Sequence, residues 1–329
     1  MLLLFATGLL FASCSNGTES RSSGSSLRDS LADARGATRA AEALRIRDDL
    51  GRALSFPRVP RRIVSLAPSI TESFFAIGAG DLLVGVTSYC TYPEAATTLP
   101  RVGDMLMPDI ERIIALKPDL VVLSIEGNRR ETFDALLRLD VPCLVTQPRT
   151  LDGVLASLRL LGSVTGRSRE AGRLADSLAA IRGQARSVAA DTSWPDGSRR
   201  IERDAQHPSV LMVLSIDPLI VVGAGTFLDE LISLAGGRNA GRVAEQPYPA
   251  LSREDVLTRN PDMLLLPTDL QITGRMLAER HPEWSRVTAV RRGAVHLVDA
   301  DVFLRPGPRV FSGLATLTRL LATERSPHR

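Results

Sequence analysis

The sequence predicts an α/β protein with two lobes, one on either side of a single long α-helix. Short apolar strands alternate with helices in both halves of the chain, which is the pattern of a mostly parallel sheet. Residues 151–190 keep apolar residues at helical spacing throughout. A helix–strand unit also occurs twice, as "ERIIALKPDLVVL" at 111–123 and "EDVLTRNPDMLLL" at 254–266. Each lobe is therefore expected to be Rossmann-like.

The chain divides into six segments by composition and periodicity. They are a signal segment at 1–14, a flexible tether at 15–58 with weak helical periodicity after Leu27, an N-terminal lobe at 59–150, the linking helix at 151–190, a polar loop at 191–208 and a C-terminal lobe at 209–325. A chain of 329 residues is long enough for two domains.

Residues 1–14 predict export. "MLLLFATGLLFASC" is an apolar run of signal-peptide length, too short to span a bilayer. Small residues before Cys14 resemble the lipobox of bacterial lipoproteins, in which the cysteine is lipidated. No basic residue precedes the run and Phe11 stands where leucine is usual, so an unlipidated secretory signal is the alternative. We expect a periplasmic or extracytoplasmic protein anchored to a membrane through Cys14.

Charge and cysteine content exclude some classes of function. The 40 basic residues, of which Lys117 alone is lysine, are scattered among 37 acidic ones, so no nucleic-acid partner is expected. Cys90 and Cys143 either pair or remain separate thiols.

Each predicted lobe alternates strands and helices. In the N-terminal lobe, "RIVSLAPS" leads into a helix opened by a capping box, Ser69-x-x-Glu72, and closed at Gly78. Further strands are expected at 82–88, 119–124 and 143–147, with helices at 109–116 and 129–139. In the C-terminal lobe we expect strands at 209–215, 263–267 and 294–298 and helices at 226–235, 252–258 and 309–322.

The repeated unit aligns two pairs of residues across the lobes. Asp109 and Ser252 are the expected helix N-caps, and Glu111 and Glu254 fall in the first turns. Acids favour helix N-termini through the helix dipole, but this does not explain their matched register. An ancestral duplication would explain it.

Signatures of catalysis are largely missing. The chain has no G-x-G-x-x-G after its first strand and no P-loop, and no Ser-His-Asp set with a recognisable elbow is found. Histidines are dispersed, at His207, His281, His296 and His328, which does not indicate a metal site. We therefore expect neither an enzyme nor a bound cofactor.

Polar and aromatic residues gather where predicted strands end. "SYCTYP" (88–93) follows one strand and carries Tyr89 and Tyr92. "EQPYP" (245–249) carries Tyr248, and "DADVFLRPGPR" (299–309) carries Asp301, Phe303 and Arg305. Ligands of open α/β sheets bind beyond the carboxyl ends of the strands, so facing lobes would gather these loops in one cleft.

These stretches resemble one known family. "RIVSLAPSITE", "VGVTSYCTYP", "ERIIALKPDLVV", "LSREDVLTRNPD" and "DVFLRPGPR" stand in the order and spacing of the helical-backbone (class III) substrate-binding proteins of bacterial ABC importers, most closely the cobalamin-binding members. The resemblance covers residues 61 to about 322.

The resemblance implies how cargo and transporter are bound. A corrinoid would lie in the cleft between the lobes, with small closure, and would contact Tyr89, Tyr248, Asp301 and Arg305. Met105 or Leu106, and Ile125, stand where the family has tryptophans, and the apolar side chains of Met105 and Ile125 would pack on a corrin face instead. One glutamate per lobe, Glu111 and Glu254, would dock onto arginines of the permease, which works with an ATPase. Family members are monomers.

Alternatives remain at this point. Met105 and Met107 are soft ligands for haem iron, so haem or a ferric siderophore could be the cargo. An α/β enzyme, or a lipid-anchored sensor that uses this fold without a transporter, belongs to a different class of function.

Overall fold

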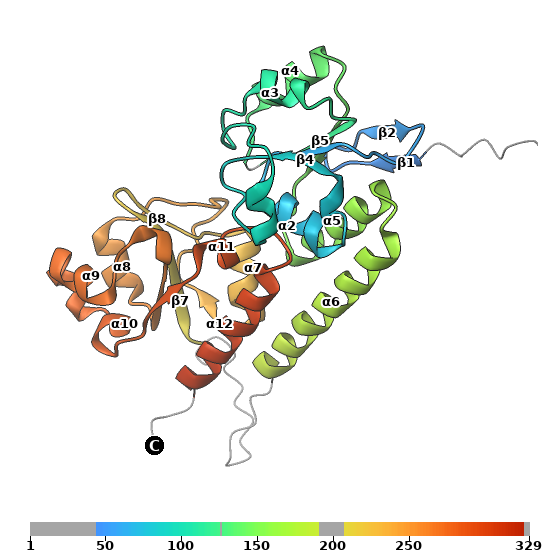
Figure 1. The fold of residues 1–329 in the computed structure, drawn as a ribbon. Coiled ribbons are helices and arrows are strands. Elements are labelled where there is room, and N and C mark those ends of the chain that lie inside the picture. Colours follow the sequence, from blue (N-terminus) through green and yellow to red (C-terminus); the bar gives the residue numbers. More distant parts are fainter. Residues whose placement is uncertain (1–43, 126, 191–206, 326–329) are drawn as a thin grey trace, which may run out of the picture. The chain divides into compact units, whose positions relative to one another are not determined.

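The computed structural model describes residues 44–125, 127–190 and 207–325, which form two α/β lobes and the helices that join them (Figure 1). The predicted signal with Cys14, most of the predicted tether and most of the predicted polar loop lie outside the described residues. In the described ranges, no helix is long and apolar enough to cross a membrane.

The N-terminal lobe contains a parallel sheet in the order β4-β3-β5-β6. Its strands are β3 (Ile63–Ser65), β4 (Leu83–Val86), β5 (Leu120–Ser124) and β6 (Cys143–Thr146); its helices are α2 (Pro68–Ala76), α3 (Ile110–Ala115) and α4 (Arg130–Arg138), with 3-10 turns η1 (Gly80–Leu82) and η2 (Glu94–Thr98). Every residue of β5 and β6 is buried, as in parallel sheets covered on both faces. The strands and helices predicted for this lobe are confirmed.

The predicted tether is wrong for its last part. Residues 44–56 form an antiparallel hairpin of β1 (Leu44–Arg47) and β2 (Ala53–Phe56). Asp48 holds the turn by accepting hydrogen bonds from the backbone N–H of Leu50 and Arg52 at 3.1 and 2.9 Å. The Asp49 N–H donates to the Val145 carbonyl at 3.1 Å, which joins the hairpin to β6. Apolar residues alternate along the hairpin and pack on the core. This is the periodicity of a strand and not the helical periodicity that was predicted.

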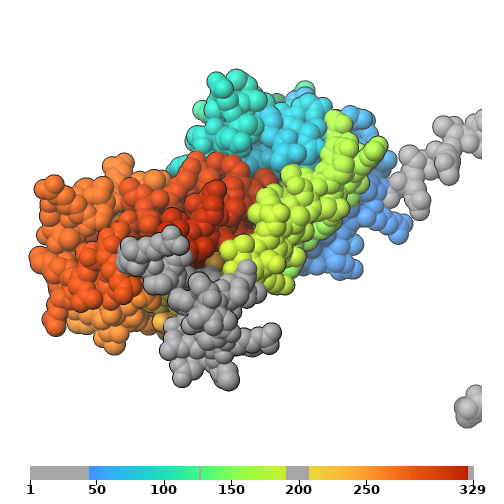
Figure 2. All heavy atoms as spheres, turned by 90° about the horizontal axis from the view of Figure 1, so that it is seen from below, coloured from blue at the N-terminus to red at the C-terminus, as the bar shows by residue number. Residues whose placement is uncertain are grey.

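The predicted single linking helix is two helices. α5 (Leu151–Val164) and α6 (Ser168–Ala190) are separated by a turn at Gly166, which has a φ of 71°. Arg159 pairs with Asp176 at 2.8 Å and Arg182 pairs with Asp152, so the two helices run antiparallel. Apolar spacing continues across the turn because both helices bury one face, and so the periodicity alone did not reveal the break. α6 packs along α12 (Val310–Arg325) of the C-terminal lobe (Figure 2).

The C-terminal lobe contains a mixed sheet in the order β11-β10-β7-β8, with β9 beside β7. Its strands are β7 (Ser209–Ile216), β8 (Leu219–Val221), β9 (Arg238–Asn239), β10 (Met263–Pro267) and β11 (Val295–Val298); its helices are α7 (Phe227–Leu234), α8 (Arg253–Arg259), α9 (Gly274–Arg280), α10 (Thr288–Arg291), α11 (Ala300–Phe303) and α12, with 3-10 turns η3 (Thr268–Leu270) and η4 (Pro282–Arg286). β8 is antiparallel to β7. β9 and β10 each pair with β7 in parallel, and β11 pairs with β10 in parallel. The predicted elements of this lobe are confirmed, and β8, β9 and the short helices add to them.

The repeated unit has the same local structure in both lobes. Asp109 caps α3 by accepting a hydrogen bond from the Arg112 N–H at 3.0 Å. Ser252 caps α8 in a capping box with Asp255, and the hydrogen bond from the Ser252 backbone lowers the pKa of that carboxyl. Both predicted N-caps are confirmed, and each helix leads into a strand with parallel neighbours.

Within the described ranges, buried residues form one large cluster that draws on both lobes through α2, α5, α6, α7 and α12, and two smaller clusters, one in each lobe. Cys90 and Cys143 are both buried free thiols of the N-terminal lobe, so they do not pair. Burial raises the pKa of the Cys143 thiol to about 12, and the thiol therefore stays protonated at neutral pH.

Two glycines near the helix pair give opposite predictions. Gly166→Ala places a side chain at a positive φ and should lower the free energy of unfolding by about 1 kcal/mol. Gly183→Ala, in the exposed interior of α6 with open space around it, should raise that free energy by about 0.5–1 kcal/mol. Urea denaturation measures both, and equal effects of the two substitutions would contradict the turn at Gly166.

Candidate ligand-binding site

The loop after β4 exposes two of the predicted aromatic residues. Tyr89 is 55% exposed and Tyr92 is 48% exposed. Below them, the Cys90 thiol is buried and lies 3.1 Å from the Thr71 hydroxyl. The chain is therefore fixed at Cys90, while the rings on either side remain available at the surface.

Asn128 fixes the carboxyl ends of two strands. Its side-chain oxygen accepts a hydrogen bond from the Ser124 N–H at 2.8 Å at the end of β5. Its side-chain nitrogen donates to the carbonyls of Leu66, just after β3, and Met105, at 2.9 and 2.8 Å. One amide group thus ties β3, β5 and the Met105 loop together. The sequence analysis did not identify Asn128.

Met105 and Ile125 lie at this edge but are placed differently. The half-buried Met105 side chain rests on Gly127, where any added Cβ would overlap the end of the methionine. Ile125 is 36% exposed and lines a pocket of about 340 Å³. None of the predicted tyrosines lines that pocket, so the structure does not bring Ile125 into one cavity with them.

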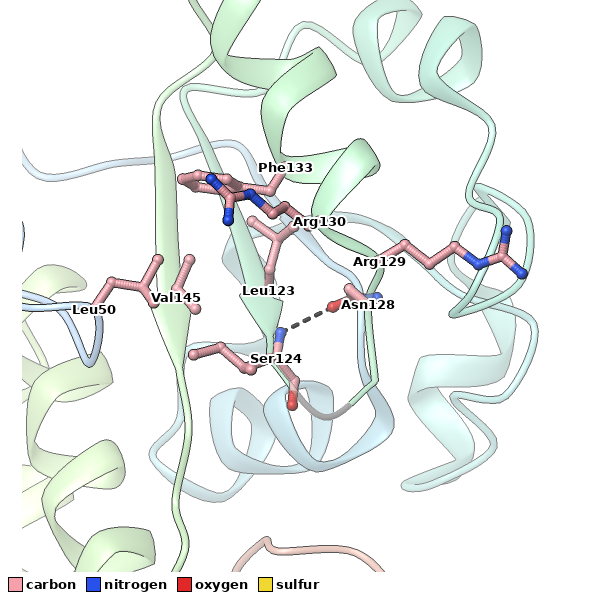
Figure 3. A pocket seen from close by; sticks show the side chains of 9 residues that line it. Leu50, Leu123, Ser124, Asn128, Arg129, Arg130, Phe133 and Val145 are labelled. Atoms are coloured by element: carbon pink, nitrogen blue, oxygen red, sulfur yellow. Dashed lines mark hydrogen bonds between the residues drawn. The ribbon is translucent and has the colours of Figure 1, made fainter.

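The pocket lies between the β1–β2 hairpin, the ends of β5 and β6, and α4 (Figure 3). It is lined by Leu50, Leu123, Ser124, Ile125, Asn128, Arg129, Arg130, Phe133 and Val145. Figure 3 shows Arg129 directed away from the apolar side chains. Apolar side chains thus form most of the walls, and of the polar residues that line the pocket, Asn128 is already hydrogen-bonded to the Ser124 N–H.

In the C-terminal lobe, Tyr248 is held at the surface by its neighbours. The backbone N–H groups of Val221 and Gly223 donate to the carbonyls of Pro249 and Pro247 at 3.1 and 2.8 Å. These bonds fasten the loop to the end of β8, and Tyr248 is 44% exposed.

Phe303 does not fit its predicted role. Its side chain is 2% exposed and belongs to the large buried cluster, because α11 turns it against Gly313 of α12. A ring in this position stabilises the lobe and cannot contact cargo. The prediction that Phe303 binds the ligand is corrected accordingly.

Asp301 and Arg305 form an ion pair, with Arg305 Nη2 2.5 Å from Asp301 Oδ1. The remaining terminal nitrogen of Arg305, Nη1, lies 3.3 Å from Glu72 Oε1 in the N-terminal lobe. The structure thus brings these two predicted residues together, and it adds a third group from the other lobe.

Glu72 and Arg309 also belong to this cluster, although the sequence analysis gave neither of them a place in the candidate site. Arg309 donates from Nε to Glu72 Oε2 at 2.8 Å and from Nη2 to Glu72 Oε1 at 2.6 Å. The Arg309 guanidinium carbon also lies 4.1 Å from the centre of the Tyr92 ring. Hydrogen bonding to Glu72 raises the pKa of Arg309 above its ordinary value.

The capping box predicted for Ser69 and Glu72 is wrong. α2 begins at Pro68 after Ala67, without a side-chain cap, and Ser69 lies inside the helix. Glu72 is buried and faces the arginines instead of the helix N-terminus. The sequence did contain a signal for this pairing, namely the single acid in the helical stretch "PSITESFFA". A carboxylate that is buried with its helix needs a charged or hydrogen-bonding partner.

The two acids predicted to dock onto the permease belong to helices that contribute no residue to this cluster. Glu111 and Glu254 are exposed in the first turns of α3 and α8. Their side chains make no hydrogen bond or ion pair with the residues that the structure describes. No group of three His, Cys, Asp or Glu side chains in the described ranges is placed to hold a metal ion.

Two α/β lobes with exposed aromatic and charged groups at their strand ends define a two-lobed binding protein. The chain belongs to the periplasmic binding protein family, whose model matches residues 63–302.

Three known proteins show the extent of the similarity. The uncharacterized ABC transporter substrate-binding lipoprotein YvrC of Bacillus subtilis is 30% identical over 270 residues, covering 80% of this chain and 81% of its own. The periplasmic heme-binding protein RhuT of Roseiflexus sp. RS-1 has a TM-score of 0.70 and 30% identity, covering 81% of this chain and 99% of its own. The periplasmic vitamin B12 binding protein BtuF of Vibrio cholerae has a TM-score of 0.70 and 28% identity, covering 82% and 99%.

Loss of the Asn128 side chain tests how the strand ends are held. Asn128→Ala should lower the free energy of unfolding by about 1–3 kcal/mol, because it leaves one N–H and two carbonyls without their partner. Thr323→Ala, which removes a local hydroxyl bond on the exposed face of α12, should change it by less than about 0.5 kcal/mol. Urea denaturation compares them, and a fully stable Asn128→Ala protein would contradict this role.

Proposed function

We propose that this protein is the extracytoplasmic substrate-binding lipoprotein of an ABC importer, which captures cobalamin or a related corrinoid and delivers it to the permease and its ATPase. The observations that carry the cargo assignment are the tyrosines exposed on both lobes and the Asp301–Arg305 pair, which shares Glu72 with Arg309, the arginine that lies over the Tyr92 ring. Tyr89, Tyr92 and Tyr248 offer ring faces and edges to a large flat ligand. Asp301 and Arg305 supply an acceptor and donors for its peripheral amides.

The similarity to BtuF of Vibrio cholerae supports a corrinoid. Haem is the second candidate, because RhuT of Roseiflexus is similar to the same extent and Met107 is largely exposed beside Met105. A ferric siderophore is the third candidate cargo, to be titrated if the protein binds neither a corrinoid nor haem.

Lipid anchoring at Cys14 is part of this proposal. Cys14 lies outside the described residues, and support comes from the signal-like sequence before it and from the similarity to a lipoprotein, YvrC. The monomeric state implied by the resemblance is likewise a proposal.

Calorimetric titration decides the cargo. We expect cyanocobalamin to bind one-to-one and hemin to bind more weakly. Tyr248→Ala should weaken cyanocobalamin binding about threefold to tenfold through loss of ring contacts. The control Leu297→Ala removes an exposed apolar side chain of β11 and should leave the affinity unchanged. Tighter binding of hemin would replace the corrinoid with haem, and binding of neither would reject both.

A charge-reversal pair tests docking. Glu111→Arg combined with Glu254→Arg should abolish cargo uptake by cells while the affinity of the purified protein for cargo stays unchanged, because both acids would face permease arginines. The matched control reverses Glu131 and Glu279, one exposed acid in each lobe, and should leave uptake intact. Normal uptake by the first variant would remove the docking assignment.

A further inference from the structure

Glu72 is the most buried charged group at the junction of the lobes. Its side chain is 1% exposed, and it lies on α2 of the N-terminal lobe. Arg305 and Arg309, its partners, come from the segment between α11 and α12 of the C-terminal lobe. The ion cluster therefore spans the two lobes.

Both oxygens of Glu72 are occupied. Oε1 accepts from Arg309 Nη2 at 2.6 Å and lies 3.3 Å from Arg305 Nη1, while Oε2 accepts from Arg309 Nε at 2.8 Å. The forked bond to Arg309 is the strong geometry for an arginine and a carboxylate. Because the arginine side chains are themselves only 20% and 21% exposed, water cannot readily replace the acid.

Two residues proposed to bind cargo, Arg305 and Tyr92, depend on Glu72 for their placement. Arg305 is held between Glu72 and Asp301, and Arg309 is held between Glu72 and the ring of Tyr92. Gly307, between the two arginines, lies against Ser69, where an added Cβ would be 3.3 Å from the Ser69 Cα. The segment is thus seated directly on the first turn of α2.

The positive charges of the two arginines in the cluster are already balanced by carboxylates. Two arginines face the carboxylates of Glu72 and Asp301, and Asp299, which caps α11, also acts on Arg309. A carboxylate of a cargo would meet arginines that are already neutralised, and it would be repelled by the three acids. An uncharged amide can instead donate to Asp301 and accept from Arg305 without this repulsion.

We propose that Glu72 is a positioning residue that makes the site selective for cargo with uncharged, amide-bearing edges over cargo with carboxylate-bearing edges. Glu72 acts through Arg305 and Arg309, whose positive charge it cancels and whose side chains it holds at the junction. This inference rests on the proposed function, because it names the chemistry of the cargo edge at the same site.

The test compares two pairs of probes, each with a charged and an uncharged form of the same edge group. Cyanocobalamin is compared with its monocarboxylate, in which one peripheral amide is hydrolysed, and hemin is compared with hemin dimethyl ester. The wild-type protein should bind the uncharged member of each pair more tightly. Glu72→Gln keeps the shape and removes one negative charge, so this preference should fall at least about threefold.

A second substitution separates charge from folding. Arg309→Gln alone removes a positive charge and should sharpen the preference. Glu72→Gln combined with Arg309→Gln restores the original net charge and should restore the wild-type ratio of affinities, even if both affinities are weaker. Loss of packing alone would change the affinities without this reversal.

Glu230→Gln is the control for junction contacts in general. Glu230 Oε2 accepts a hydrogen bond from the Leu151 N–H at 2.7 Å, away from the cluster, so its variant should keep the wild-type ratio. Cyanocobalamin binding with an unchanged ratio in Glu72→Gln would overturn the role of Glu72 and leave the proposed function standing. Failure of all four probes to bind the wild-type protein would overturn this inference together with the proposed cargo.

Discussion

The buried carboxylate of Glu72 is the constraint around which the junction of the two lobes is organised. A carboxylate with a 1% exposed side chain is tolerated only if its charge is matched nearby, and here the matching charges come from the other lobe. The directional bonds of this ion cluster therefore fix how the segment of one lobe sits on the helix of the other. A purely apolar contact has no such direction and would let the two surfaces slide past each other. Arg305 and Tyr92 are oriented as a consequence, since each contacts this cluster.

The parallel strands in both sheets explain why the candidate recognition groups collect where they do. Parallel strands all end at one edge, and the loops that follow them carry Tyr89 in one lobe and Asp301 in the other. The repeated helix–strand unit lies beside each edge and leaves Glu111 and Glu254 exposed in its first turns. In the proposed function, cargo recognition and transporter docking therefore use different parts of the same repeated architecture, so that each can be altered without the other.

Local patterns were sufficient for much of this fold. The buried strands, the N-caps Asp109 and Ser252 and the equivalence of the two repeat units depend on contacts between near neighbours, and all are confirmed. The break at Gly166 was hidden because α5 and α6 each bury an apolar face. The hairpin at 44–56 was missed because strands this short acquire their stability from contact with β6 and the core.

The site was less predictable, for a physical reason. Glu72 stands three residues after Ser69, a local pattern that favours a capping box, while its true partners follow 233 and 237 residues later. Phe303 lies beside Asp301 in the sequence, yet the turn of α11 sends its ring into the core. Asn128 carries no motif, because its importance comes from three backbone groups that only the folded chain brings together.

A crystal structure of the protein with bound cyanocobalamin would test the central claim most directly. The account predicts a corrin in contact with tyrosines of both lobes, with peripheral amides on Asp301 and Arg305 and the forked bond between Glu72 and Arg309 intact. A corrinoid bound elsewhere, for example against the pocket beside Ile125, or a Glu72 carboxylate separated from Arg309 in the loaded protein, would contradict it.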